Sequence, residues 1–182
     1  MPVSAINTND HYIGNKNAPI TFVVYEDYEC EYCEKSFSDL KNLTDTYRQH
    51  VCFVYRHFPF MRMHPHAMLA ALVVEACGLQ NKFMEAHDCI FKNQVYLEYG
   101  LGGILRLLEK DYGICIDKLN EDLQKAEVVK KVSNDIASGV RCYIKNTPSI
   151  FINGERYTGE VALPVLGKVI RRLMTELHLN AI

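Results

Sequence analysis

Two cysteines separated by two residues form the pattern in this sequence that is best suited to chemistry. Cys30 and Cys33 follow an apolar, β-branched run and stand where a helical periodicity begins. At a helix N-terminus, the helix dipole and the unpaired backbone N–H groups favour the thiolate form of a cysteine. A thiolate is the form that attacks a disulfide, so we predict that Cys30 is the nucleophile and that Cys33, one helical turn later, is the resolving cysteine. The spacing therefore predicts a redox centre.

Acidic side chains crowd this cysteine pair. The segment from Glu26 to Lys35 holds five carboxylates, namely Glu26, Asp27, Glu29, Glu31 and Glu34. A carboxylate ~7 Å from a thiolate opposes it by roughly 0.6–2.4 kcal/mol. We therefore expect Glu31 and Glu29 to raise the thiol pKa and to make the pair a weaker oxidant than a strongly oxidising DsbA. The alternative is that these acids only favour the helix N-terminus and point into water.

Asp27 has two interpretations. If it is partly buried, its carboxylate could relay a proton to Cys33 during resolution. We favour the other interpretation, in which Asp27 is a turn or cap residue before the helix.

The composition is that of one globular domain. The chain has 182 residues, of which 48% are hydrophobic and 23% are charged, and its net charge is −2. The longest basic groupings are pairs such as Lys130-Lys131, which argues against nucleic acid or an anionic membrane as a partner. No run approaches the ~18 apolar residues of a membrane span. The first fifteen residues lack a basic start and an apolar region, so the chain as given is expected in the cytoplasm. A periplasmic location is the alternative if the N-terminus was trimmed.

The cysteine count gives mild support to the cytoplasm. There are seven cysteines, an odd number, and only Cys30 and Cys33 have a short, motif-like spacing. Cys77 and Cys89 lie in helical patterns and Cys52 lies in a strand pattern. Free, buried cysteines of this kind suit a reducing compartment, where they act as small apolar residues.

The cysteine pair lies in a strand–helix–strand pattern. The sequence predicts a strand at Ile20–Tyr25, a helix from the cysteine pair to Tyr47 and a strand at Val51–Phe58, with a short edge strand at Asp10–Gly14 before them. The apolar helix positions that share one face are Cys33, Phe37, Leu40, Leu43 and Tyr47. This order predicts a parallel strand pair with a right-handed crossover.

The remaining sequence is helical at first and then returns to β structure. Helices are predicted from Pro65, in a first turn, to Cys77, and at Lys82–Phe91, Leu101–Tyr112, Ile116–Lys125 and Glu127–Val140. A hairpin follows, with strands at Ser149–Ile152 and Glu155–Tyr157 around the turn pair Asn153-Gly154, and a helix at Val165–Leu177 ends the pattern. The helical block from Pro65 to about Tyr143 is expected to be an insertion in one domain.

The order of these elements resembles the DsbA-like branch of the thioredoxin-fold family. The stretches that carry the resemblance are Ala18-Pro19-Ile20, Tyr25 to Cys33, Arg56-His57-Phe58-Pro59, His64-Pro65-His66-Ala67, Thr147 to Gly154, and Tyr157-Thr158-Gly159. The resemblance implies an α/β thioredoxin fold with a central mixed sheet and a helical insertion, about 65–143, between the βαβ and ββα halves of a single domain, 1–182. Two features depart from the family pattern: Glu31 stands where relatives commonly carry proline, and the segment Arg141–Asn146 looks longer than usual.

The resemblance also implies how substrate is held. The Thr147-Pro148 peptide bond is expected to be cis and to lie against the cysteine pair, with the Thr147 backbone free to pair with an extended substrate strand. Tyr32 is expected at the exposed rim of the site, where it would cover an apolar substrate side chain. The alternative is an ordinary surface tyrosine.

These expectations combine into a thiol–disulfide oxidoreductase. The partners would be protein thiols and disulfides, held through transient mixed disulfides, and glutathione or a redox partner protein. No organic cofactor is expected, because the cysteine pair carries two electrons. The direction of the reaction (oxidase, reductase or isomerase) stays open.

Two alternatives belong to other classes of protein. One is a non-catalytic thioredoxin-fold binding or chaperone-like module, and the other is a protein that binds metal through the CxxC thiolates. The histidines His57, His64 and His66, with Cys52 upstream, do not match zinc-ligand spacing, so no metal site is predicted.

Overall fold

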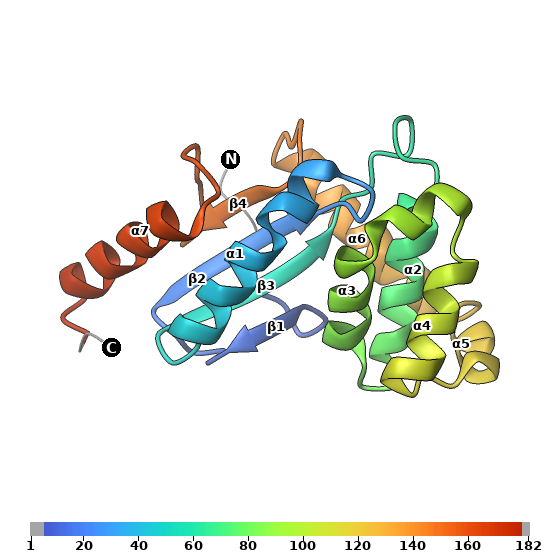
Figure 1. Cartoon of the computed structure of the whole chain (residues 1–182). Helices are drawn as coiled ribbons and strands as arrows, with labels where there is room; N and C mark the ends of the chain where they lie inside the picture. Colours follow the sequence, from blue (N-terminus) through green and yellow to red (C-terminus); the bar gives the residue numbers. More distant parts are fainter. Residues whose placement is uncertain (1–5, 180–182) are drawn as a thin grey trace.

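A five-stranded mixed sheet with helices on both faces forms the centre of the protein (Figure 1). The computed structural model describes residues 6–179. The strands are β1 (His11–Gly14), β2 (Ile20–Glu26), β3 (Val51–His57), β4 (Ser149–Ile152) and β5 (Glu155–Arg156). The helices are α1 (Glu31–Tyr47), α2 (Ala67–Gly78), α3 (Phe83–Lys92), the 3₁₀ helix η1 (Gln94–Tyr99), α4 (Gly102–Tyr112), α5 (Ile116–Asp122), α6 (Ala126–Arg141) and α7 (Leu163–Glu176). The predicted thioredoxin fold is confirmed.

The cysteine-bearing half of the sheet follows the sequence pattern closely. The strand order is β1-β3-β2-β4-β5. Strands β2 and β3 pair in parallel, with Phe22 opposite Phe53, and α1 provides the crossover between them. Strand β1 pairs antiparallel with β3 and forms one edge, as predicted. All apolar side chains predicted for the inner face of α1 are buried.

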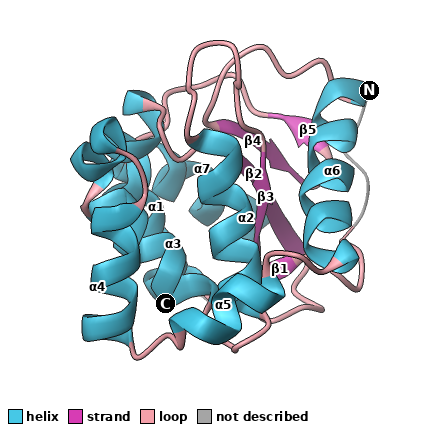
Figure 2. Cartoon of the chain, turned by 90° about the vertical axis from the view of Figure 1, so that its right-hand side faces the viewer, coloured by secondary structure: helices cyan, strands magenta, loops and turns pink. Residues whose placement is uncertain are grey.

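The two faces of the sheet pack against different layers. Figure 2 shows the sheet nearly edge-on, with α6 on one side and α1 and α7 on the other. Because side chains alternate along a strand, Phe22 and Val24 of β2 belong to the larger core with α1, whereas Val23 and Tyr25 face the smaller core. Helices α2 to α5 extend the larger core beyond the end of the sheet.

The helical insertion is present, and most of its helices begin and end within one residue of the prediction. Helix α2 begins at Ala67, so Pro65 precedes the helix and is not in its first turn. Helix α5 ends at Asp122 instead of Lys125, and the Asp122 carboxylate accepts hydrogen bonds and ion pairs from Lys118 and Lys125. The 3₁₀ helix η1 was not predicted. Its six residues are too few to show a helical period.

The C-terminal hairpin and helix also form. Asn153 and Gly154 both have positive φ, 49° and 87°, as the tight turn between β4 and β5 requires. Strand β5 ends at Arg156, one residue before the predicted Tyr157. Helix α7 begins two residues earlier than predicted, because Pro164 is suited to the first turn of a helix.

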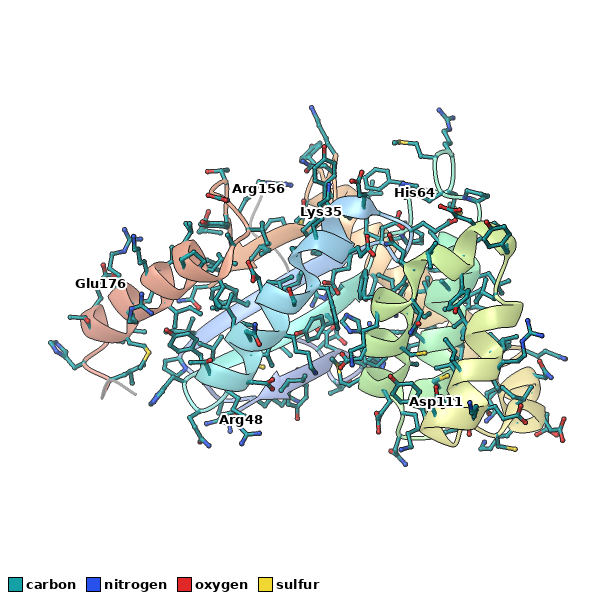
Figure 3. The ribbon with its side chains drawn as sticks, viewed as in Figure 1. Lys35, Arg48, His64, Asp111, Arg156 and Glu176 are labelled. Carbon is teal, nitrogen blue, oxygen red and sulfur yellow. The ribbon has the colours of Figure 1, made fainter. Side chains whose placement is uncertain are left out.

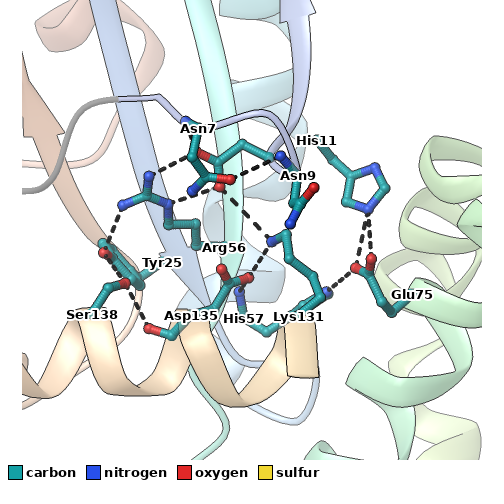
Figure 4. A network of polar contacts seen from close by, with 11 residues as sticks. Asn7, Asn9, His11, Tyr25, Arg56, His57, Glu75, Lys131, Asp135 and Ser138 are labelled. Atoms are coloured by element: carbon teal, nitrogen blue, oxygen red, sulfur yellow. Dashed lines mark hydrogen bonds and ion pairs between the residues drawn. The ribbon is translucent and has the colours of Figure 1, made fainter. Parts of the chain in front are cut away.

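A buried polar network fixes β1 to β3 and α6 (Figure 4). The Arg56 guanidinium donates to Asp10 Oδ2 at 2.7 Å and to the Tyr25 hydroxyl at 3.1 Å. Lys131 of α6 contacts Asp10 and forms a 2.6 Å ion pair with Asp135. Arg56 and Asp10 are both almost completely buried, and their paired charges compensate for the loss of water.

Candidate active site

Cys30 and Cys33 lie at the beginning of α1, directly after the turn that follows strand β2. Cys30 is the N-cap residue with an extended backbone, φ −78° and ψ 119°, and its carbonyl accepts the N–H groups of Cys33 and Glu34. Cys33 lies within the first helical turn. Cys30 is 7% exposed and Cys33 is completely buried, so only the first thiol is within reach of a partner. Both are free thiols in this structure.

The Thr147-Pro148 loop lies directly against Cys30. The peptide bond between these two residues is cis, as expected. The Cys30 thiol donates a hydrogen bond to the Thr147 carbonyl oxygen, with a sulfur–oxygen distance of 3.2 Å. The expected pairing of the Thr147 backbone with a substrate strand stays a prediction.

The two thiols have opposite acidities. The Cys33 thiol donates a hydrogen bond to the Cys30 sulfur, and this bond is the main reason that the pKa of Cys30 is lowered to about 5. Burial opposes the shift, while hydrogen bonding to Thr147 and to backbone N–H groups supports it. Burial raises the pKa of Cys33 well above its ordinary value, and the hydrogen bond to Cys30 and the charge of Glu26 add to this. The thiolate form is therefore favoured at Cys30 and the protonated thiol form at Cys33.

The two acidic neighbours of Cys30 each have a partner. Glu31 forms an ion pair with Lys35 one helical turn away, and both side chains are exposed. Glu29 accepts hydrogen bonds from the His66 backbone N–H at 2.6 Å and from His66 Nδ1 at 3.0 Å. The expected rise in the pKa of Cys30 is not seen: its pKa is lowered, and neither carboxylate is among the main causes of the shift. Their effect on the redox potential stays a prediction.

Asp27 holds two loops together. It is almost completely buried, and its Oδ1 accepts the Glu29 backbone N–H at 2.9 Å. Its Oδ2 accepts the Phe60 N–H and bonds to His64 Nδ1, both at 2.7 Å. Figure 3 places His64 and Lys35 at the same end of the molecule, the end where α1 begins. These bonds favour the turn interpretation of Asp27, because they engage both of its oxygens.

Three further residues, none of them predicted as a site residue, complete the site. Glu26, the last residue of β2, is buried, and its Oε2 lies 2.9 Å from His87 Nε2 of α3. A single acid that continues an apolar strand was the available signal for Glu26. Gln94 of η1 donates through its side-chain amide to the carbonyl oxygens of Tyr28, at 2.9 Å, and Cys30, at 3.1 Å. No sequence signal pointed to Gln94.

A surface groove of about 480 Å³ runs beside the cysteine pair. Tyr32, which is 70% exposed, forms part of its wall together with Thr147 and Pro148, so the structure brings the three predicted substrate-binding residues together. The other lining residues are Lys35, Ser36, Asn146 and Val161.

The histidines considered as metal ligands have other partners. His57 contacts Glu75, while His64 and His66 bond to Asp27 and Glu29. Within residues 6–179, no group of three or more histidine, cysteine or acidic side chains is placed to hold a metal ion.

This fold and this site define a class. A thioredoxin fold, a CxxC pair at the start of its first long helix, a cis-proline beside the pair and a helical insertion are the features of DsbA-like thioredoxin-fold proteins. The comparison with protein families agrees, since the family described as Thioredoxin matches residues 6–172. The chain belongs to the thioredoxin family.

Solved structures share the fold over almost the whole chain. A thioredoxin-like oxidoreductase from Silicibacter pomeroyi DSS-3 has a TM-score of 0.77 and 23% sequence identity, covering 93% of this chain and 94% of the other. Wolbachia pipientis alpha-DsbA1 has a TM-score of 0.78 and 21% identity, covering 94% of each chain. BdbD from Bacillus subtilis has a TM-score of 0.78 and 20% identity, covering 96% of each. The fold is therefore DsbA-like.

The curated relatives are longer membrane transporters. The Na(+)/H(+) antiporter NhaA 3 of Salinispora tropica is 30% identical over 161 residues, 88% of this chain, and NhaA 1 of Salinispora arenicola is 30% identical over 162 residues. The chain spans 24% of the length of each of these relatives. Between residues 6 and 179, none of the helices is both long and apolar enough to span a bilayer.

Proposed function

We propose that this protein is a thiol–disulfide oxidoreductase that exchanges disulfides through Cys30 and Cys33. The observation that carries the proposal is the division of the pair into a low-pKa thiol that is 7% exposed and a protonated thiol beside it that is completely buried. A non-catalytic binding module needs neither thiol nor this difference in acidity. Disulfide exchange needs both.

The reaction proceeds in two balanced steps. The Cys30 thiolate attacks a substrate disulfide, forms a Cys30–substrate disulfide and releases one substrate thiolate. Cys33 then loses its proton, attacks the Cys30 sulfur and releases the second substrate thiolate. The protein ends with a Cys30–Cys33 disulfide, and two electrons have passed to the substrate. The same steps in reverse oxidise a substrate dithiol.

The pair requires no organic cofactor, because its own sulfur atoms carry the electrons. The partners are proteins with accessible thiols or disulfides, which would lie in the groove between Tyr32 and Pro148. In this position an extended peptide would pair with the backbone of Thr147, which lies against Cys30. Glutathione or a redox partner protein would return the pair to its starting state.

The acidity of Cys30 bears on how oxidising the pair is. A pKa of about 5 lies between the values of about 7 for thioredoxin and about 3.5 for DsbA. Two units of pKa below pH 7 stabilise the dithiol form, which makes the pair more oxidising by roughly 60 mV than one with ordinary thiols. We therefore propose a moderate oxidant, weaker than a strongly oxidising DsbA.

The test measures mixed-disulfide formation and enzymatic activity in three single variants. Cys33→Ser should accumulate a mixed disulfide between Cys30 and a peptide disulfide, whereas Cys30→Ser should form none. Both should lose insulin reduction and peptide oxidation. Cys115→Ser is the matched control, because Cys115, the N-cap residue of α5, is exposed. The proposal fails if Cys30→Ser retains full activity. The alternative, a protein that binds metal through the CxxC thiolates, is tested by metal analysis of protein purified without chelator.

A further inference from the structure

The side chain of Gln94 links the helical insertion to the backbone that carries the nucleophile. Gln94 is the first residue of η1, and its Nε2 lies 2.9 Å from the Tyr28 carbonyl oxygen and 3.1 Å from the Cys30 carbonyl oxygen. Carbonyl oxygens only accept hydrogen bonds, so the NH₂ group of the amide must face them, and its two N–H groups supply one donor for each. Both donors of this amide therefore serve the active-site turn, and neither serves η1.

The Cys30 carbonyl has a particular place in this turn. It is the carbonyl of the N-cap residue of α1, and it also accepts the backbone N–H groups of Cys33 and Glu34, at 3.0 and 3.1 Å. Gln94 adds a donor from outside the helix. A donor at this oxygen offsets part of its negative charge, which otherwise opposes an anion on the sulfur of the same residue. The bond thus bears on the charge of the nucleophile as well as on its position.

The position of Cys30 matters because the donors that stabilise its thiolate belong to other residues. Hydrogen bonds from the Cys33 thiol and from the backbone N–H groups of Cys33 and Tyr32 lower the pKa of Cys30. A hydrogen bond weakens steeply as its distance and angle leave the preferred range. A small shift of the Cys30 backbone would therefore weaken several of these contacts at once.

Two different segments hold the turn that precedes α1. The loop that follows β3 bonds to Asp27 and Glu29. Gln94 bonds to Tyr28 and Cys30, the residues that alternate with these two along the chain. The insertion thereby reaches the backbone of the nucleophile itself.

The segment that carries Gln94 is packed in place. Leu97 of η1 is almost completely buried and belongs to the larger core. The Asn93 side-chain amide donates to the Cys89 carbonyl oxygen at 2.8 Å, which fixes the connection between α3 and η1. Figure 1 shows α3 beside α1. A packed element therefore presents the Gln94 amide to the turn, as the precise placement of a neighbouring group requires.

We propose that Gln94 is a positioning residue for the nucleophile: its amide holds the Tyr28–Cys30 backbone where the Cys30 sulfur meets the donors at the start of α1. The inference rests on the proposed function and gives the helical insertion a part in the reaction. Gln94 exchanges neither a proton nor an electron, and it acts through the geometry of Cys30. A merely structural clamp would hold the insertion in place without any effect on the Cys30 thiol.

The test compares Gln94→Met with Gln80→Met, both in a Cys115→Ser background that removes an exposed thiol. Methionine has nearly the length and volume of glutamine but no donor. Gln80 is the matched control, because its side chain makes the same kind of contact within the insertion. Its Nε2 donates to the Cys115 carbonyl oxygen at 3.2 Å, and its Oε1 accepts the Cys115 backbone N–H at 3.2 Å. Cys115, like Cys30, is an N-cap residue.

The measured quantity is the pH dependence of iodoacetamide alkylation at Cys30. Gln94→Met should raise the midpoint by roughly 0.5–1 pH unit, the effect of about one hydrogen bond, and should lower the redox potential accordingly. Gln94→Glu should raise the midpoint at least as far, because a carboxylate offers no donor and adds negative charge beside the turn. Gln80→Met should leave the midpoint unchanged. Urea denaturation checks that each variant folds.

The outcomes separate this inference from the proposed function. A midpoint near the ordinary value of 9 in the parent protein would contradict the proposed function and this inference with it. A parent midpoint near 5 that stays unchanged in folded Gln94→Met would overturn the role of Gln94 alone, as would an equal shift in Gln80→Met. If Gln94→Met does not fold, Gln94→Glu decides, since it keeps the length and shape of the side chain.

Discussion

The Cys33 thiol donates a hydrogen bond to the Cys30 sulfur, so the resolving cysteine also sets the acidity of the nucleophile. We predict that Cys33→Ala raises the pKa of Cys30 above 5 while leaving it below 9, since Thr147 and the backbone N–H groups still contribute. The pH dependence of iodoacetamide alkylation measures this value. Cys115→Ala should leave the midpoint unchanged. A midpoint near pH 5 in Cys33→Ala would show that the hydrogen bond from Cys33 does not set the acidity of Cys30.

The ion pair between Glu31 and Lys35 allows two opposite tests of charge at the site. Removal of the Glu31 carboxylate should stabilise the thiolate, so Glu31→Gln should raise the redox potential by roughly 10–15 mV, as expected for a well-solvated charge ~7 Å away. Lys35→Gln should lower the potential, because it leaves Glu31 without its partner. Glu31→Pro should also raise it.

Equilibration against glutathione buffers measures these potentials. An unchanged or lowered value in both Glu31 variants would mean that the acidic residues point into water and do not influence Cys30.

The buried pair of Asp10 and Arg56 should be costly to break from one side. Asp10→Ala leaves the guanidinium of Arg56 and the ammonium of Lys131 with less negative charge around them, and we expect a loss of about 3–5 kcal/mol in unfolding free energy. The double variant Asp10→Ala with Arg56→Met should recover much of this loss, because it removes the charge that was left. Urea denaturation measures both. A double variant that is less stable than Asp10→Ala would contradict this account.

Glu75 should make stability depend on acid pH. Burial would raise the pKa of Glu75, but hydrogen bonds from His11 and His57 outweigh it and lower the value to about 2 (Figure 4). Because the pKa is lower in the folded protein, the contribution is complete above about pH 4.5 and is lost as the pH falls towards 2. Its size is on the order of 3 kcal/mol. Urea denaturation between pH 2 and 7 should show this loss in the native protein, and Glu75→Gln should lack it.

Local patterns predicted much of the fold, because local physics dominates those segments. The structure of three segments is indicated by residues that are close together in the sequence: the β-branched run of β2, the apolar face of α1 and the Asn153-Gly154 turn. The cysteine pair was predictable for the same reason, since its spacing and its place before a helix lie in one short segment.

The rest of the site depends on contacts between distant segments. Glu26 and His87 are 61 residues apart, and no pattern in either segment predicts their contact. Gln94 approaches the Cys30 carbonyl from a 3₁₀ helix that is too short to show a periodicity. The hydrogen bond from the Cys30 thiol to Thr147 joins residues 117 positions apart. The packing of the insertion against the sheet brings His87 and Gln94 to the site, and the pairing of β2 with β4 brings Thr147 to Cys30.

The attachment of η1 and α3 to the active-site end of the sheet has a practical consequence for engineering. Exchange of the insertion for that of another family member would replace Gln94 and His87 along with the outer surface. A chimera built to change partner choice would therefore also change how firmly Cys30 is held and which side chain Glu26 contacts behind it. Specificity and redox chemistry cannot be tuned independently in this architecture unless both side chains are transplanted back.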